Sequence, residues 1–328
     1  MNTGTLKKLM TLIGPFLGLI GLFLFFAIDS ENGGFFRDPS NLRIIIIQTV
    51  IVALGALGMT MIIVSGGIDL SVGSVISLSG VTAAVILNTA VASGIGASTS
   101  AWLAVGAGLG VGCLVGGING SLITTLRIPA FIVTLGMLGI ARGTSKWLAG
   151  NQAVAVEKSW IGSLLSQSQL YFHFPIGVWI TIVLAVLTSV LMKYTIFGRY
   201  MYAVGSNEST ARLCGINVGL NRIMIYSLAG TLFGLTGIMQ LARLRTGDPT
   251  VAVGLELDII AAVIIGGASL SGGKGGILGS IIGALIMSVL RVGSTQRDWP
   301  NYIQEIIIGI VIILAVTVDH FRSRKDKS

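Results

Sequence analysis

The sequence predicts an all-α membrane protein, a polytopic helical bundle with about ten transmembrane segments and broken helices. Of the 328 residues, 53% are hydrophobic and only 10% are charged, whereas a soluble domain carries about 25% charged residues. The apolar residues form long runs, several of them near the roughly 20 residues that a helix needs to cross a bilayer. The 46 glycines lie within such runs, where a missing side chain lets helices approach closely.

The apolar runs predict ten spans, of which the eighth is much too short to cross a membrane alone. We interpret it as half of a broken or re-entrant element. Lys7 and Lys8 precede the first run as in a signal peptide, but no cleavage motif follows, so we expect an uncleaved span. The expected spans are Thr11–Ile28, Ile44–Val64, Leu70–Ala90, Ala101–Ile123, Phe131–Leu148, Ile176–Met192, Ile223–Leu241, Ile259–Ile265, Ile277–Leu290 and Ile303–Val318.

Glycines at four-residue spacing recur in the fourth span and predict close contact with a neighbouring helix. In the fifth span, Arg142 is expected to extend towards the outer interface, with a pathway-lining role as the alternative. An outer cluster of charges forms either a solvated rim or a surface for a soluble partner. The glycines are Gly106, Gly108, Gly110, Gly112, Gly116 and Gly120, and the outer cluster is Arg243, Arg245, Asp248, Glu256 and Asp258.

The polar stretch Lys193–Arg222 interrupts the apolar runs and carries a helix signal of its own. Ser206 or Asn207 can cap a helix over Glu208–Cys214, with its acidic residue in the first turn and Arg212 in the last. Gly215 suits the left-handed residue after the helix. Two turns do not persist alone in water, so this helix either docks on a partner or belongs to an ordinary connecting loop.

Two similar segments, Gly66–Gly73 and Gly266–Gly273, lie 200 residues apart, each between apolar stretches. Glycine pairs break helices, and broken helices at matching positions of two halves indicate a transport pathway. Ser71 or Ser271 can satisfy the freed backbone groups or cap the helix that follows. Two tight cytoplasmic turns are the simpler alternative, and Asp69 is either a functional carboxylate near the membrane or the N-cap of the third span. The candidate pathway or gate residues are Gly66, Gly67, Asp69, Ser71, Gly266, Gly267, Ser269 and Ser271.

The basic residues predict the orientation, with both termini in the cytoplasm. In this arrangement 12 basic residues face the inside against four acidic ones, so the whole net charge of +8 lies there, as the positive-inside rule expects. Nucleic acid is therefore not needed as a partner. The inner residues are Lys7, Lys8, Arg127, Lys193, Arg199, Arg212, Arg222, Lys274, Arg322, Arg324, Lys325 and Lys327, with Asp69, Glu208, Asp319 and Asp326.

The sequence offers no site for a metal, cofactor or nucleotide. Cys113 and Cys214 lie far apart without a C-x-x-C spacing, and His173 and His320 are isolated. Gly272–Gly275 lacks the glycine and the Ser or Thr of a phosphate-binding loop. We therefore expect no enzyme activity, no cofactor and no ATP chemistry of the chain's own.

Four stretches resemble the permeases of ribose-type ABC importers: SGGIDLSVGS (65–74), RIPAFIVTLGMLGIARG (127–143), AVGSNESTARLCGIN (203–217) and ELDIIAAVIIGGASLSGGKGG (256–276). The resemblance spans nearly the whole chain and implies a single transmembrane permease domain over residues 1–328, of the type II-like importer architecture. It implies a bacterial inner-membrane location, a second permease copy or relative, cytoplasmic ATPase subunits and a periplasmic sugar-binding protein.

The resemblance also implies that the loop of about 194–221 couples the permease to its ATPase. Its coupling residues would be Gly205, Asn207, Glu208, Ala211, Arg212 and Gly215, with the small face around Ala211 turned to the partner. The alternatives are an ion-coupled secondary sugar transporter, or the same importer fold with another small polar solute, such as a sugar-derived signal. A secondary transporter needs ionisable residues in mid-membrane, and only Asp69 and Arg142 are candidates.

Overall fold

The computed structural model describes residues 3–28, 36 and 38–325. Asp326 and Lys327, used above for the orientation, lie outside the described residues. Within this part of the chain there are 12 named α-helices, and each expected span falls on one of them. They are α1 (Thr3–Ala27), α3 (Pro39–Val64), α4 (Val72–Ala92), α5 (Ala97–Leu126), α6 (Ala130–Leu148), α7 (Ile176–Tyr194), α8 (Ile196–Ser206), α9 (Glu208–Leu213), α10 (Val218–Leu244), α11 (Leu255–Ile265), α12 (Ile277–Gln296) and α13 (Asn301–Lys325).

Six of the described helices are long and apolar enough to cross a membrane, namely α3, α4, α5, α7, α10 and α12. The helices α1 and α13 carry shorter apolar stretches, Gly14–Ala27 and Asn301–Leu314. With 11 residues, α11 is short, as its run predicted. The chain is thus an all-α polytopic membrane protein, and the count of about ten spans stays a prediction.

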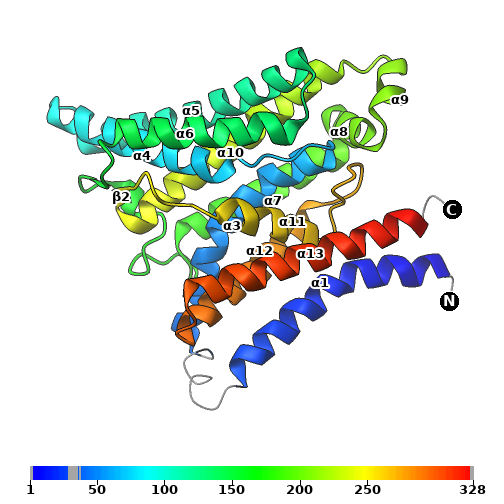
Figure 1. The fold of residues 1–328 in the computed structure, drawn as a ribbon. Coiled ribbons are helices and arrows are strands. Elements are labelled where there is room, and N and C mark those ends of the chain that lie inside the picture. The colour runs from blue at the N-terminus through cyan, green and yellow to red at the C-terminus, as the bar shows by residue number, and fades with distance from the viewer. Residues whose placement is uncertain (1–2, 29–35, 37, 326–328) are drawn as a thin grey trace.

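The centre of the bundle is α3, which packs against α10, α11, α12 and α7 (Figure 1). All its residues from Val50 to Val64 are buried, because its sequence is apolar on every side and a helix of that kind belongs in a protein interior. In Figure 1, α4, α5 and α6 lie on one side of this centre and α1 and α13 on the opposite one. Of these two, α1 packs against α12, and α13 packs mainly against α11.

The glycines of α5 form its contact with α10. A Cβ on Gly108, Gly112, Gly116 or Gly120 would press into α10, where Gly230 and Gly234 supply the facing gaps. The prediction of close contact is therefore confirmed for these four residues, which repeat every four positions on one helix face. It is wrong for Gly106 and Gly110, where a Cβ would meet no atom of another described segment within 4 Å, because a shift of two residues turns them to the other side of the helix.

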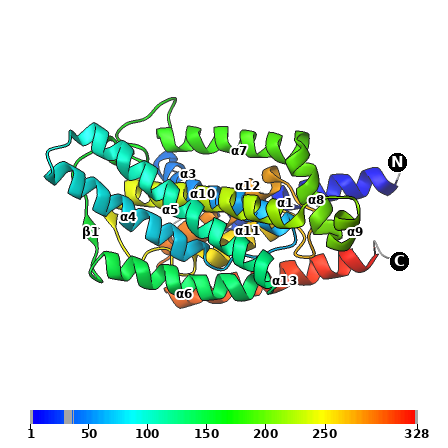
Figure 2. The same ribbon diagram turned by 90° about the horizontal axis from the view of Figure 1, so that it is seen from above.

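The polar stretch after α7 holds two helices, whereas its sequence pattern predicted one. The expected short helix is α9, and the unforeseen one is α8, which begins where the Thr195 hydroxyl accepts a hydrogen bond from the Gly198 amide (3.1 Å). Helix α8 was not predicted, because its aromatic residues and glycines have low helix propensity. Figures 1 and 2 place α9 at the same end of the molecule as the start of α1 and the end of α13.

The opposite end of the molecule carries a two-residue ladder, in which β1 (Val154–Ala155) pairs antiparallel with β2 (Thr246–Gly247). A 3₁₀ turn, η1 (Trp160–Ser163), lies in the same connection between α6 and α7. The start of α1, the end of α13 and the central loop thus lie at one end of the molecule, and their common position on one side of the membrane stays a prediction. Which side is cytoplasmic stays a prediction from the charges.

The α5–α10 contact yields a stability prediction. Gly116→Ala places a methyl group against the Tyr226 carbonyl and should lower the free energy of unfolding by about 1–3 kcal/mol through overpacking. The control Gly110→Ala adds the same methyl group to the same helix in open space, so stability should not fall. Thermal unfolding of the detergent-solubilised variants measures both, and equal midpoints would contradict the contact.

Candidate functional site

The candidate coupling helix α9 begins and ends with the caps that its sequence indicates. Of the two expected caps, Asn207 has this position, and its Oδ1 accepts a hydrogen bond from the Thr210 amide (2.9 Å). Gly215 follows the helix with a φ of +82°, a conformation in which a side chain is strained. The local sequence therefore defines α9 at both ends.

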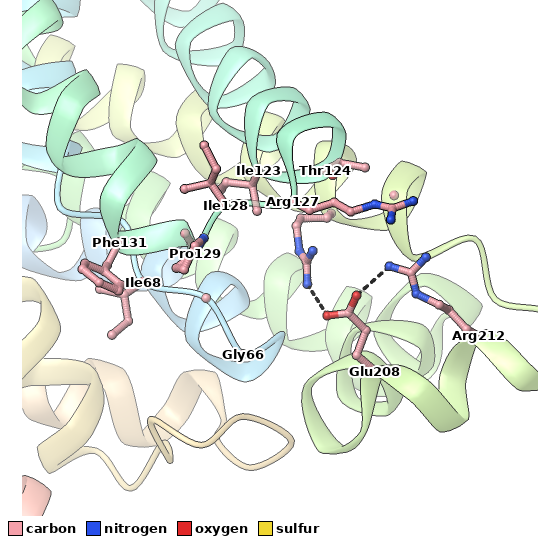
Figure 3. Close-up of a pocket in the computed structure, with 14 residues that line it drawn as sticks. Gly66, Ile68, Ile123, Thr124, Arg127, Ile128, Pro129, Phe131, Glu208 and Arg212 are labelled. Carbon is pink, nitrogen blue, oxygen red and sulfur yellow. Dashed lines mark hydrogen bonds and ion pairs between the residues drawn. The ribbon is translucent and has the colours of Figure 1, made fainter.

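Glu208 ties this short helix to the membrane bundle. Its carboxylate accepts from Arg212 within α9 (2.7 Å) and from Arg222 on α10 (2.9 Å), and Figure 3 shows both ion pairs. The Arg212 hydrogen bond, together with Arg222, holds the pKa of this carboxyl below its usual range against the effect of partial burial. Glu208 thus stays charged at neutral pH and holds α9 beside α10.

The face of α9 that could meet a partner differs from the expected one. Ala211 is only 4% exposed and packs against Val204 and Val218, so the prediction that it turns outward is wrong. Leu213 is 88% exposed instead. It is the only large apolar residue between Gly205 and Gly215, a signal that could have identified it.

Both glycine-containing segments end a helix with a left-handed glycine, but in a shifted register. After α3, the amides of Gly66 and Gly67 donate to Ile63 and Ile62 (2.9 and 3.0 Å), and Gly66 has a φ of +84°. After α11, Gly267 has the corresponding conformation, with a φ of +92°. Gly66 therefore corresponds to Gly267, an offset of 201 residues, where the sequence match suggested 200. This hydrogen-bond pattern satisfies carbonyls left free at a helix end.

The two segments diverge beyond these glycines. The first leads into α4 at Val72, whereas the second continues through residues 272–276 before α12 begins at Ile277. Of the two roles expected for Ser271, capping of the next helix is therefore wrong, because Gly276 has the cap position of α12. The Ser271 amide donates to the Ser269 hydroxyl (3.3 Å). Ser71 has the cap position of α4 but forms no side-chain cap bond.

Asp69 is buried, with 1% exposure, and binds the start of α4. Its Oδ1 accepts from both the amide and the hydroxyl of Ser71 (2.8 and 2.6 Å). Asn119 on α5 donates to the same hydroxyl (3.1 Å). Asp69 is therefore not the N-cap that was expected, because Ser71 has that position; its carboxylate instead holds the turn that leads into α4, and Asn119 ties this turn to α5.

The coupling and gating candidates meet at the end of α8. A Cβ on Gly205 would overlap the Val64 carbonyl, and Gly66 and Gly272 also lie against this residue. The Gly273 amide donates to that Val64 carbonyl (2.8 Å). The Tyr202 hydroxyl donates to Gly275 (2.9 Å). One helix end thus contacts both glycine segments at once.

Two charged side chains near the end of the molecule opposite α9 do not lie where the sequence predicted them. Arg142 does not extend outward but donates to the carbonyls of Pro249 and Val251 (3.0 and 2.7 Å), because loop carbonyls lie within its reach. Asp258 is fully buried and pairs with Arg291 on α12, so it belongs to no solvated rim. Among the described residues, no three His, Cys, Asp or Glu side chains gather as metal ligands.

Comparisons with known proteins agree on one family. The family described as "Branched-chain amino acid transport system / permease component" matches residues 41–316. The ribose import permease protein RbsC of Escherichia coli (strain K12) is 39% identical over 310 residues, or 92% of each chain. RbsC of Bacillus subtilis is 38% identical, covering 98% of this chain and 95% of its own. The L-arabinose permease AraH of Escherichia coli (strain K12) is 33% identical, covering 94% and 90%. No solved structure matches.

The hydrogen bonds from Ser71 to Asp69 yield a prediction. Asp69→Asn keeps an oxygen for the Ser71 amide and should change stability little, whereas Asp69→Ala leaves this buried amide without its acceptor and should cost about 1–3 kcal/mol. Thermal unfolding and solute uptake are measured for both variants. An Asn variant that is stable but inactive would instead assign a charge-dependent role to this carboxylate.

Proposed function

Because the chain belongs to the permease family of ribose-type ABC importers, we propose that it forms the passage of an ATP-driven importer for a monosaccharide. The observation that carries this proposal is the identity of 33–39% to ribose and arabinose permeases over more than nine-tenths of the chain. Ribose or a related simple sugar is the proposed substrate. Another small polar solute on the same fold is the alternative.

The proposed driving force comes from a separate cytoplasmic ATPase that contacts α9. The exposed Leu213 gives this helix an apolar contact residue, and Glu208 fixes the helix to α10 through Arg222. A force on α9 reaches α8 through Asn207, which ends one helix and caps the next. The same force reaches both glycine segments at Gly205, which lies against Gly66 and Gly272. This chain of contacts supports the proposal that these segments gate the passage.

Alternating access then requires two packings of similar stability. ATP binding moves α9, and the segments after α3 and α11 move with the end of α8. A ligand shifts such an equilibrium only by its preference for one packing over the other. The remaining proposed partners are a periplasmic binding protein and a second permease, identical or related, in the bacterial inner membrane, with both termini in the cytoplasm.

The structure gives the secondary-transporter alternative little support. Ion coupling calls for ionisable groups in mid-membrane that can gain and lose an ion. The two candidates are already engaged by protein groups, Asp69 by Ser71 and Arg142 by loop carbonyls.

The energy source is tested by reconstituting the permease with its ATPase and binding protein in vesicles. Uptake of labelled ribose or arabinose should require ATP and persist when ionophores collapse the proton and sodium gradients. Uptake that stops with an ionophore would favour the secondary transporter. Competition of unlabelled ribose or arabinose with uptake of the labelled sugar then identifies the preferred substrate.

The coupling surface is tested with Leu213→Ala. Removing most of this exposed side chain should weaken binding to the ATPase about tenfold or more, since burying a leucine contributes about 1.5–3 kcal/mol. Leu187→Ala on α7, which is 57% exposed, is the matched control and should bind normally. Normal affinity in the Leu213 variant would show that α9 is not the docking surface.

A further inference from the structure

A cleft of about 470 Å³ lies between α9, the loop that joins α5 to α6, and the Gly66–Ile68 segment. Its two sides differ in chemistry. Figure 3 shows Arg127, Glu208 and Arg212 on one side, and Ile68, Pro129 and Phe131 on the other. The cleft is therefore amphipathic, with a charged side at α9 and an apolar side at the start of α6.

The charged side carries an excess of positive charge. Three guanidinium groups, those of Arg127, Arg212 and Arg222, line it against the one carboxylate of Glu208. That carboxylate is shared by Arg212 and Arg222. Among the residues that the structure describes, Arg127 has no hydrogen-bonded or ionic partner. A net charge of about +2 therefore faces the cleft, and one cation is available for an external anion.

The apolar side continues onto the surface of α6. Phe131 lines the cleft and is 51% exposed, and Ile132 and Leu135 beside it are 47% and 54% exposed. These residues start α6 directly after Pro129, at the end of the molecule where α9 lies. An apolar chain could thus leave the cleft along α6 without entering water.

We propose that this cleft binds the headgroup of an anionic phospholipid from the cytoplasmic leaflet. The phosphate lies at Arg127 beside Arg222, and the acyl part follows Phe131 along α6. Basic pockets at the cytoplasmic ends of membrane helices bind such headgroups. Neither a free phosphate nor an acidic side chain of a soluble partner would use the apolar side. The inference rests on the proposed function only for the cytoplasmic position of α9.

The test uses the purified full-length chain in detergent, without ATPase or sugar. Native mass spectrometry measures its retention of phosphatidylglycerol and of phosphatidylcholine with the same acyl chains. We expect preferential retention of phosphatidylglycerol, and an about fivefold weaker binding in Arg127→Gln, since one surface cation contributes roughly 1 kcal/mol to anionic lipid binding. Arg127→Lys should retain most of the binding.

The matched control is Arg199→Gln, which removes the same charge from α8, outside the cleft. Equal losses in both variants would reveal unspecific attraction and overturn the site. Unchanged binding in Arg127→Gln at a normal unfolding midpoint would overturn it as well. Displacement of the lipid by millimolar inorganic phosphate would identify free phosphate as the occupant. An Arg127→Gln variant with normal lipid retention but weaker ATPase binding would assign the cation to the ATPase.

Discussion

Much of this molecule depends on one backbone contact, in which the end of α8 lies directly on the end of α3. Gly205 contacts the Val64 carbonyl, and the same carbonyl accepts from the Gly273 amide (2.8 Å). No other residue type fits at position 205, because a Cβ there would occupy the space of the carbonyl. The contact joins three chain segments through main-chain atoms. Because these atoms cannot change rotamer, a displacement of one segment also moves the other two. The proposed coupling of α9 to the gate uses this rigidity.

The elements could be predicted from the sequence, but most of their neighbours could not. Apolar runs indicated the long helices, and Asn207 and Gly215 indicated the ends of α9, since caps depend on local chemistry. The α5 glycines were predicted as a contact, but the sequence did not say that only every fourth one faces α10. Ala211 is an example of a residue whose neighbours could not be predicted. A small residue fits equally well on a docking face or under a helix, and only the positions of Val204 and Val218 in the fold show that Ala211 is buried.

Long-range polar pairing was the least predictable part. Arg142 meets carbonyls more than 100 residues away, and Asp258 meets Arg291 on another helix. In an apolar bundle, an isolated polar group is costly, so these pairings follow from the fold and are not visible in a local pattern. The register shift between the two glycine segments could not be predicted either. Their amino-acid sequences align with an offset of 200 residues, whereas the left-handed glycines that end the two helices are 201 residues apart.

The position of α8 also determines how many steps a gating cycle can have. One end of this helix contacts Val64 and Gly66 after α3, as well as Gly272 and Gly275 after α11. Displacing one segment while the other stays in place would break the Gly273–Val64 hydrogen bond and leave a buried carbonyl unpaired, at a cost of about 1–3 kcal/mol. If the two segments form the proposed gate, a state in which only one of them has moved is therefore disfavoured, and the two segments of each chain would move together.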